Sequence, residues 1–141
     1  MNAAGIDVSK GKSMVAALRP MGEVALLPRE FLHTEVGLEQ MAYAIIALGE
    51  DTRVIMEATG RYHEPVAAAL HEYGIYVCVL NPLFIKQSGG GSIRKVKTDK
   101  ADAIKIAKYG LATKIGSEVV YLATKIGSEV VYLDKQVFNA S

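Results

Sequence analysis

Residues 3–18 read AAGIDVSKGKSMVAAL, and this stretch decides the fold. Its first half alternates, with Ile6 and Val8 on one face of an expected strand and Asp7 on the other. A tight turn follows, and a second apolar strand begins at Ser13. The stretch therefore predicts an antiparallel strand pair that carries an acid inside an apolar strand.

The rest of the chain extends this pair and then changes period. Turn residues precede a third strand, and apolar residues then recur at three- and four-residue steps, which is typical of amphipathic helices. After strands at 3–9 and 13–18, we expect a strand at 23–34, a helix at 36–48, a strand at 53–57, a helix at 60–73, a strand at 75–80 and a helix from 98 or 99 to about 111. This order predicts an α/β fold with a mixed sheet, a three-strand antiparallel meander followed by alternating helices and strands, and it resembles the layout of ribonuclease H-like domains.

Composition excludes several classes of protein. The chain has 141 residues, of which 50% are hydrophobic and 22% are charged, so it can bury a core and is not a disordered tail. The single cysteine, Cys78, excludes a disulfide framework and a cysteine-rich zinc site. The longest uncharged apolar run, residues 73–85, is too short to span a bilayer, and no secretory leader is visible. We therefore expect a cytoplasmic protein without membrane association.

Charge is distributed unevenly along the chain. Residues 1–85 carry six Lys or Arg and ten Asp or Glu. Residues 86–114 carry eight Lys or Arg and only two Asp or Glu. A basic segment after an acidic body is a candidate surface for nucleic acid. A solvated lysine-rich loop and helix face explains the same charge equally well. Residues 86–97 contain three consecutive glycines and are expected to form a mobile loop.

The end of the chain contains an exact repeat. Residues 111–121 read LATKIGSEVVY, and residues 122–132 repeat them without a change. Eleven residues is a helical period, but Gly116 and Gly127 weigh against a continuous helix, and short strands fit as well. The choice stays open at this point, and we expect residues 112–141 to be a tail rather than a domain.

Four acids stand at the ends of expected strands and helices. Asp7 lies in the first strand, and Glu57 closes a later strand directly before a helix. Asp99 and Asp102 are three residues apart, so they share one face of the last helix. Each acid alone fits a capping role, but four converging carboxylates repel one another unless cations neutralise them. Oxygen ligands suit Mg²⁺ or Mn²⁺, and two such ions can promote phosphodiester displacement.

Four motifs carry a resemblance to a known family. GIDVSK, EATGRYHEP, GIYVCVLNP and KTDKADA occur in this order, and they resemble the N-terminal, RuvC-like catalytic domain of the DEDD-type transposases of bacterial insertion sequences. The resemblance covers roughly residues 4–111 and implies a domain at residues 1–111. Family members continue into a helical region and a second, serine-bearing domain. The repeated tail replaces these parts here, so the resemblance implies a fragment of a longer protein.

The resemblance also implies a function and its residues. The acidic tetrad of the family falls on Asp7, Glu57, Asp99 and Asp102, which implies two bound Mg²⁺ or Mn²⁺ ions and cleavage and strand transfer of DNA. The implied partners are DNA, an element-encoded RNA and further copies of the chain, in the bacterial cytoplasm at the nucleoid. The residues expected to bind the DNA backbone are Lys86, Arg94, Lys95, Lys97 and Lys100.

Two other functions stay open. The first is a catalytically incomplete module that lacks the second domain and only binds nucleic acid or self-associates. This hypothesis expects Asp99 and Asp102 to point away from Asp7. The polar turn from Ser9 to Ser13 is similar to the phosphate-holding turn of the sugar kinase and actin-like group, which suggests a nucleotide-binding protein. That turn lacks the glycine-rich character that wraps a phosphate, so this third hypothesis is the weakest.

Overall fold

The computed structural model describes seven segments of the chain, which contain ten helices and strands in all. The described segments are residues 1–49, 51–57, 60–75, 77–80, 99–112, 121–126 and 129–134. Their elements are β1 (Asn2–Ser9), β2 (Lys12–Leu18), β3 (Val24–Leu32), α1 (Glu35–Ile46), β4 (Thr52–Glu57), α2 (His63–Glu72), β5 (Val77–Leu80), α4 (Asp99–Ala112), β6 (Tyr121–Ile126) and β7 (Glu129–Asp134). The loop expected at 86–97 lies outside the described residues.

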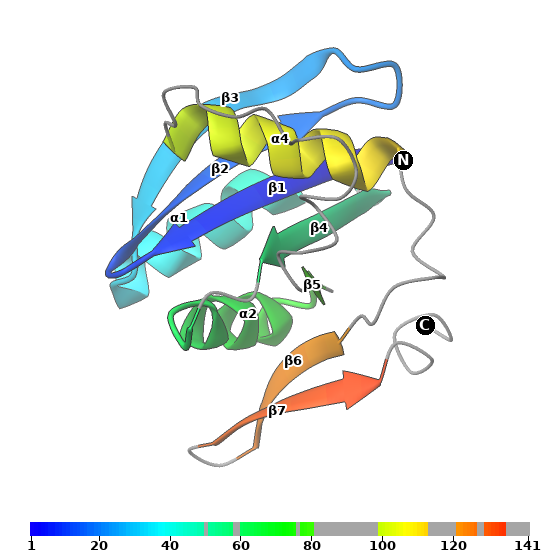
Figure 1. Ribbon diagram of the computed structural model, residues 1–141. Helices are drawn as coiled ribbons and strands as arrows, with labels where there is room; N and C mark the ends of the chain where they lie inside the picture. The colour runs from blue at the N-terminus through cyan, green and yellow to red at the C-terminus, as the bar shows by residue number, and fades with distance from the viewer. Residues whose placement is uncertain are drawn as a thin grey trace.

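The strands form one mixed sheet in the order β3-β2-β1-β4-β5-β6-β7. β1, β2 and β3 are an antiparallel meander, β4 joins β1 in parallel, and β5 joins β4 in parallel (Figure 1). β6 and β7 extend the sheet as an antiparallel pair. The predicted α/β fold, a meander followed by alternating helices and strands, is confirmed.

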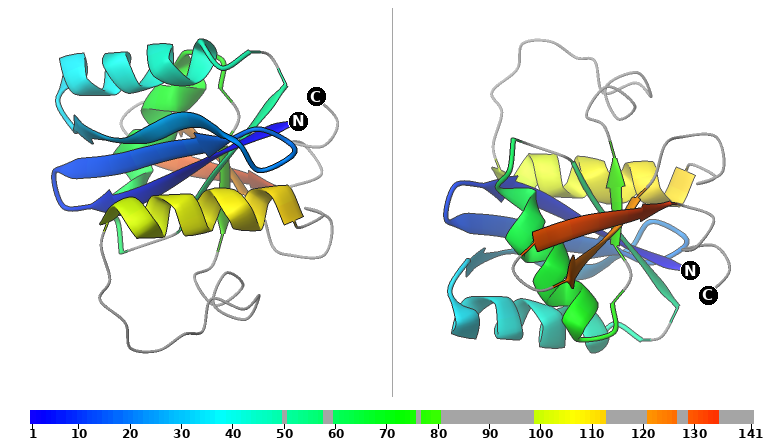
Figure 2. Two further views of the ribbon diagram at one scale, coloured as in Figure 1. Left: turned by 90° about the horizontal axis from the view of Figure 1, so that it is seen from above. Right: turned by 90° about the horizontal axis from the view of Figure 1, so that it is seen from below.

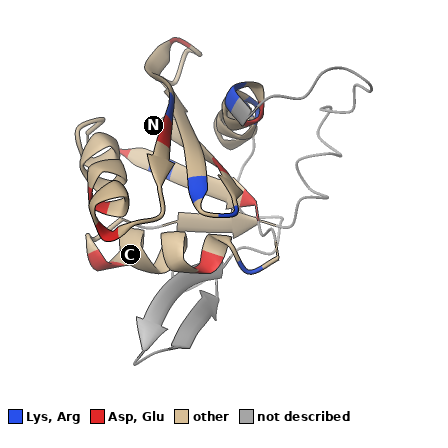
Figure 3. Cartoon of the chain, turned by 90° about the vertical axis from the view of Figure 1, so that its left-hand side faces the viewer, with Lys and Arg blue, Asp and Glu red and all other residues tan. Residues whose placement is uncertain are grey.

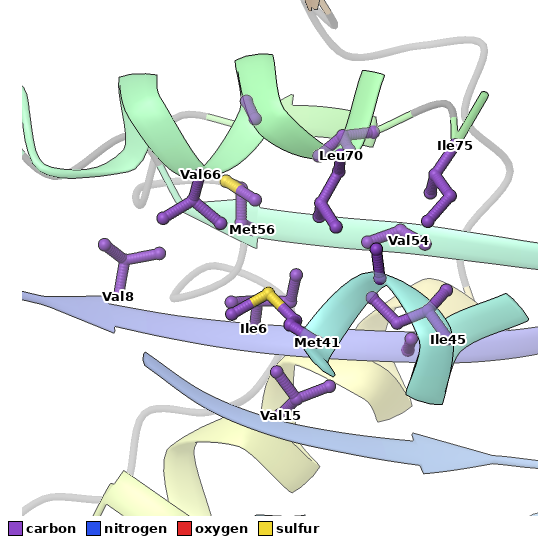
Figure 4. Close-up of a cluster of buried hydrophobic side chains, with 14 of the residues drawn as sticks. Ile6, Val8, Val15, Met41, Ile45, Val54, Met56, Val66, Leu70 and Ile75 are labelled. Carbon is purple, nitrogen blue, oxygen red and sulfur yellow. The ribbon is translucent and has the colours of Figure 1, made fainter. Parts of the chain in front are cut away.

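Helices cover both faces of the sheet, with α1 and α2 on one face and α4 on the other (Figure 2). The larger core lies under α1 and α2, where side chains from seven helices and strands pack together. Figure 4 shows part of this cluster. Its fully buried members include Ile6, Met41, Val54, Met56 and Leu70. Burial of each such side chain contributes about 1.5–3 kcal/mol, so this layer dominates the stability of the fold.

The boundary between β3 and α1 is set by a capping residue. Thr34 Oγ1 accepts a hydrogen bond from the Gly37 amide at 3.0 Å, which satisfies one of the free amides at the helix start. The strand expected at 23–34 therefore ends at Leu32, and Thr34 belongs to the helix instead. A Cβ on Gly37 would collide with the Leu32 carbonyl oxygen, so the helix starts in direct contact with the strand before it.

The repeated sequence takes two structures. Leu111 and Ala112 open the first copy and end α4 as helix, whereas Leu122 and Ala123 open the second copy and lie in β6. β6 reaches the sheet through the pairing of Tyr121 with β5. Where the repeat is described beyond α4, it is therefore strand, and the domain boundary expected at residue 111 stays a prediction.

Candidate acidic site

Two of the four predicted acids lie opposite each other. β1 and β4 pair in parallel with a constant register that ends with Ile6 opposite Met56. Continuing this register by one residue places Asp7 opposite Glu57, the last residue of β4. Both side chains are half-buried, and each interacts with other groups of the protein.

Both acids face α4. Ile6 and Met56 belong to the core under α1 and α2, and they directly precede Asp7 and Glu57. Because successive side chains alternate across a strand, the two acids point to the opposite face, which α4 covers (Figure 2). The sheet therefore places two carboxylates side by side at the carboxyl ends of neighbouring strands.

The direction of α4 brings a third acid to the same end of the sheet. α4 runs opposite to β1 and β4, so its first turn lies where both strands end (Figure 1). Ile106 lies over Gly5, because a Cβ on that glycine would be 3.0 Å from the Ile106 carbonyl carbon. Asp102 precedes Ile106 by about 6 Å of helix. Asp7 follows Gly5 by about 7 Å of strand, so Asp102 lies level with Asp7.

The fourth acid, Asp99, is the first residue of α4, and the structure describes its backbone but not its side chain. Among the described side chains, no three His, Cys, Asp or Glu come close enough together to hold a metal ion. The structure therefore pairs Asp7 with Glu57 and brings Asp102 level with them, whereas the complete tetrad stays a prediction. The available donors are carboxylate oxygens, and this donor set fits Mg²⁺ or Mn²⁺ and not zinc.

The charges of the two helical layers differ in sign. α4 carries three lysines and two aspartates, whereas α1 and α2 together carry four glutamates and no Lys or Arg. Figure 3 looks along α4 and shows its basic residues in blue. Lys100, predicted to bind nucleic acid, is exposed on the first turn of α4. The other predicted contacts lie outside the described residues: Lys86, Arg94, Lys95 and Lys97.

A serine–histidine pair, which no sequence motif indicates, joins two neighbouring strands. Ser13 Oγ lies 2.7 Å from His33 Nε2, and burial lowers the pKa of the imidazole. A hydroxyl beside a neutral imidazole is the arrangement of an activated nucleophile. Ser13, however, is only 1% exposed and lies opposite Val8, on the face away from the acids. The pair therefore joins β2 to the end of β3, and no substrate reaches its hydroxyl.

The turn after β1 was the basis of the nucleotide-binding hypothesis. Ser9 Oγ donates a hydrogen bond to the Lys12 carbonyl at 3.2 Å, across the residues that reverse the chain. Gly11 supplies the positive φ of +79° that this reversal uses. The hydroxyl is therefore engaged within its own turn, which does not favour a phosphate-holding role.

The fold and the paired acids define a ribonuclease H-like α/β domain. A solved structure of Thermus thermophilus RuvC aligns with a TM-score of 0.56 and 16% identity, over 85% of this chain and 99% of that chain. A second RuvC structure, in complex with a Holliday junction substrate, aligns with a TM-score of 0.55 and 14% identity over the same shares. A family model, DEDD_Tnp_IS110, described as a transposase, matches residues 4–134. The chain belongs to this transposase family.

The predicted family and the RuvC-like fold are thus confirmed, and the family match continues beyond residue 111 into β6 and β7. Pilin gene-inverting proteins of Moraxella lacunata and Moraxella bovis are each 40% identical over 57 residues. That match covers 40% of this chain but 18% of either relative. Among the described residues, no helix is both long enough and apolar enough to cross a membrane.

Proposed function

We propose that this chain carries the catalytic site of a DNA transposase, which cleaves phosphodiester bonds with divalent metal ions and joins DNA strands. The observation that carries the proposal is the register of β1 and β4, which sets Asp7 opposite Glu57 on the face under α4. Membership of the transposase family and the RuvC-like fold support it.

The ligands of the proposed metal site are Asp7, Glu57, Asp99 and Asp102. When bound there, Mg²⁺ or Mn²⁺ would lower the pKa of an attacking water or hydroxyl and stabilise the leaving oxygen. Asp7 and Glu57 are held by strands on both sides of the pair, which keeps their carboxylates in place. Both acids are half-buried on the face that α4 covers. The chain's own contribution is therefore a rigid pair of oxygen donors in a half-buried setting.

DNA is the substrate class that the charges support. α4 carries three lysines and covers the face of the sheet to which the acids point. Lys100 is exposed on its first turn, so a phosphate backbone drawn to it would approach the end of the sheet where the acids lie. The RuvC structure with a Holliday junction substrate shows that a protein of this fold can hold branched DNA. An RNA partner, self-assembly and a further serine-bearing domain remain proposals from the family resemblance.

The test compares two Asp→Asn variants of the full chain. Asp7→Asn removes one carboxylate of the pair, whereas Asp51→Asn removes an exposed acid near the start of β4, at the other end of the strand pair. We expect Mn²⁺ to raise the melting temperature and support cleavage of branched DNA in the wild-type chain and in Asp51→Asn. Both responses should be lost in Asp7→Asn. A wild-type response in Asp7→Asn would contradict the proposed metal site.

The second candidate is a binding module without catalysis. It is favoured by Lys100, which is exposed on the first turn of α4 and can contact a phosphate backbone whether or not the acids hold a metal ion. In that case the wild-type chain binds branched DNA with a steep salt dependence but neither cleaves it nor responds to Mn²⁺. Asp7→Asn then binds DNA as the wild-type chain does, so the same two variants separate the candidates.

A further inference from the structure

α4 rests on the sheet through buried side chains such as Ile106 and Tyr109 and, at two glycines, through very close contacts. A Cβ on Gly5 of β1 would collide with the Ala103 carbonyl oxygen and the Ala107 amide nitrogen of α4. Near the other end of the helix, a Cβ on Gly110 would collide with the Ile55 side chain of β4. These close approaches leave the helix little freedom to move toward the sheet or to roll on it.

Arg53 holds the last turn of this helix. Its Nη1 donates a hydrogen bond of 2.8 Å to the Gly110 carbonyl oxygen, one of the last carbonyls of α4, which lack partners inside the helix. Arg53 is half-buried, and a positive charge at a helix carboxyl end is favoured by the helix dipole. A charge-assisted bond of this kind is stronger than a neutral one. Arg53 therefore fixes the position of α4 along its axis.

The strand that carries Arg53 also carries Glu57. The two residues are four apart on β4, on the same face, which is a separation of about 13 Å along the strand. Along α4, Gly110 and Asp102 are eight residues apart, which is about 12 Å. Because helix and strand run in opposite directions, holding Gly110 over Arg53 brings Asp102 level with Glu57.

We infer that Arg53 is a positioning residue for the acidic site, a role that rests on the proposed function. Arg53 lies near the start of β4, whereas Glu57 is its last residue. It acts through α4, whose axial position sets the distance from Asp102 to Asp7 and Glu57. The affinity of the site for a divalent ion therefore depends on a hydrogen bond at the opposite end of the helix.

The experiment measures metal affinity and helix opening on the full chain. Arg53→Met keeps much of the length of the side chain but removes its donors, and Arg53→Lys keeps one cation. Thr34→Ala is the matched control, because it removes a helix cap from α1 on the other face of the sheet. Mn²⁺ binding is followed by electron paramagnetic resonance, and amide hydrogen exchange of α4 is measured without metal.

We expect Arg53→Met to weaken Mn²⁺ binding about tenfold, the lower end of the effect of outer-sphere partners on metal sites. Exchange of the α4 amides should rise relative to β1 and β2. Arg53→Lys should recover part of the affinity, and Thr34→Ala should change neither readout. If Arg53→Met does not fold, a few-fold loss in Arg53→Lys supports the same inference.

Two results would overturn the positioning role. Equal Mn²⁺ affinity in Arg53→Met and the wild-type chain would defeat this inference alone and leave the proposed function intact. A wild-type chain that binds no Mn²⁺ would defeat the proposed function and the inference together. An equal loss of affinity in Thr34→Ala would show that any destabilisation suffices, and it would also overturn the specific role of Arg53.

Discussion

Substitution of Gly5 by alanine tests whether α4 lies directly on the backbone of β1. Gly5 pairs with Ala16 on one side and Ile55 on the other, in the middle of three strands. The added Cβ would meet the Ala103 oxygen and the Ala107 nitrogen, which are backbone atoms of a helix and cannot rotate away. To accept one methyl group, the whole of α4 must lift from the sheet.

The size of the effect follows from two opposing contributions. Overpacking a well-filled contact costs about 1–3 kcal/mol. Replacing a strand glycine by alanine also restricts the unfolded chain, and this stabilises the folded state by about 0.4–1 kcal/mol and offsets part of the overpacking cost. The net expected loss is about 1–2 kcal/mol of unfolding free energy. In a chain near 150 residues this corresponds to roughly 3–8 °C in the melting temperature.

Circular dichroism melting gives the loss, and hydrogen exchange shows where it acts. Gly11→Ala is the control, because its Cβ meets nothing within 4 Å but its φ of +79° strains an alanine. We expect both variants to lose stability and only Gly5→Ala to increase exchange in α4. A neutral or stabilised Gly5→Ala would refute the direct seating of α4 on β1, and the placement of Asp102 would fail with it.

Two further predictions concern buried titratable groups. Burial raises the pKa of the Cys78 thiol to about 12, against a smaller opposing effect of Arg53, so thiol reagents at pH 8 should label the native chain only as fast as it unfolds. Labelling within seconds, without unfolding, would contradict that burial. Burial lowers the pKa of His33 from 6.5, so the unfolded chain binds more protons than the folded chain as pH falls through 6.5. The unfolding free energy of the wild-type chain should therefore fall more between pH 7 and pH 5 than that of His33→Gln. Chemical denaturation at the two pH values measures this difference. An equal fall in both chains would contradict the prediction.

Most of the elements could be predicted because each has a local cause. Alternation predicts β1 and β2, and three- and four-residue spacing predicts α1. The error at the end of β3 also has a local cause, since Thr34 has high strand propensity but its hydroxyl is better used as a helix cap. Boundaries of this kind depend on which hydrogen bond a side chain makes in the folded state.

The candidate site was only partly accessible to prediction. Asp7 and Glu57 stood out because acids at the ends of apolar strands need a reason. Arg53 gave no such signal, because an arginine at the start of a strand is ordinary on a protein surface. The role inferred for it depends on the hydrogen bond to the carbonyl of Gly110, a residue distant in sequence.

By itself the amino-acid sequence determined which segments become strands or helices and which acids stand at their ends. The tertiary structure decided the pairing of β1 with β4 and therefore the juxtaposition of Asp7 and Glu57. The repeat shows most directly what the sequence alone leaves undecided, because its first residue is helical in one copy, at Leu111, and extended in the other, at Leu122. The first copy continues a helix already packed on the sheet, whereas the second lies in a strand paired with its neighbours. For these residues the helical and the extended conformation are close in local energy, so long-range contacts decide which one forms.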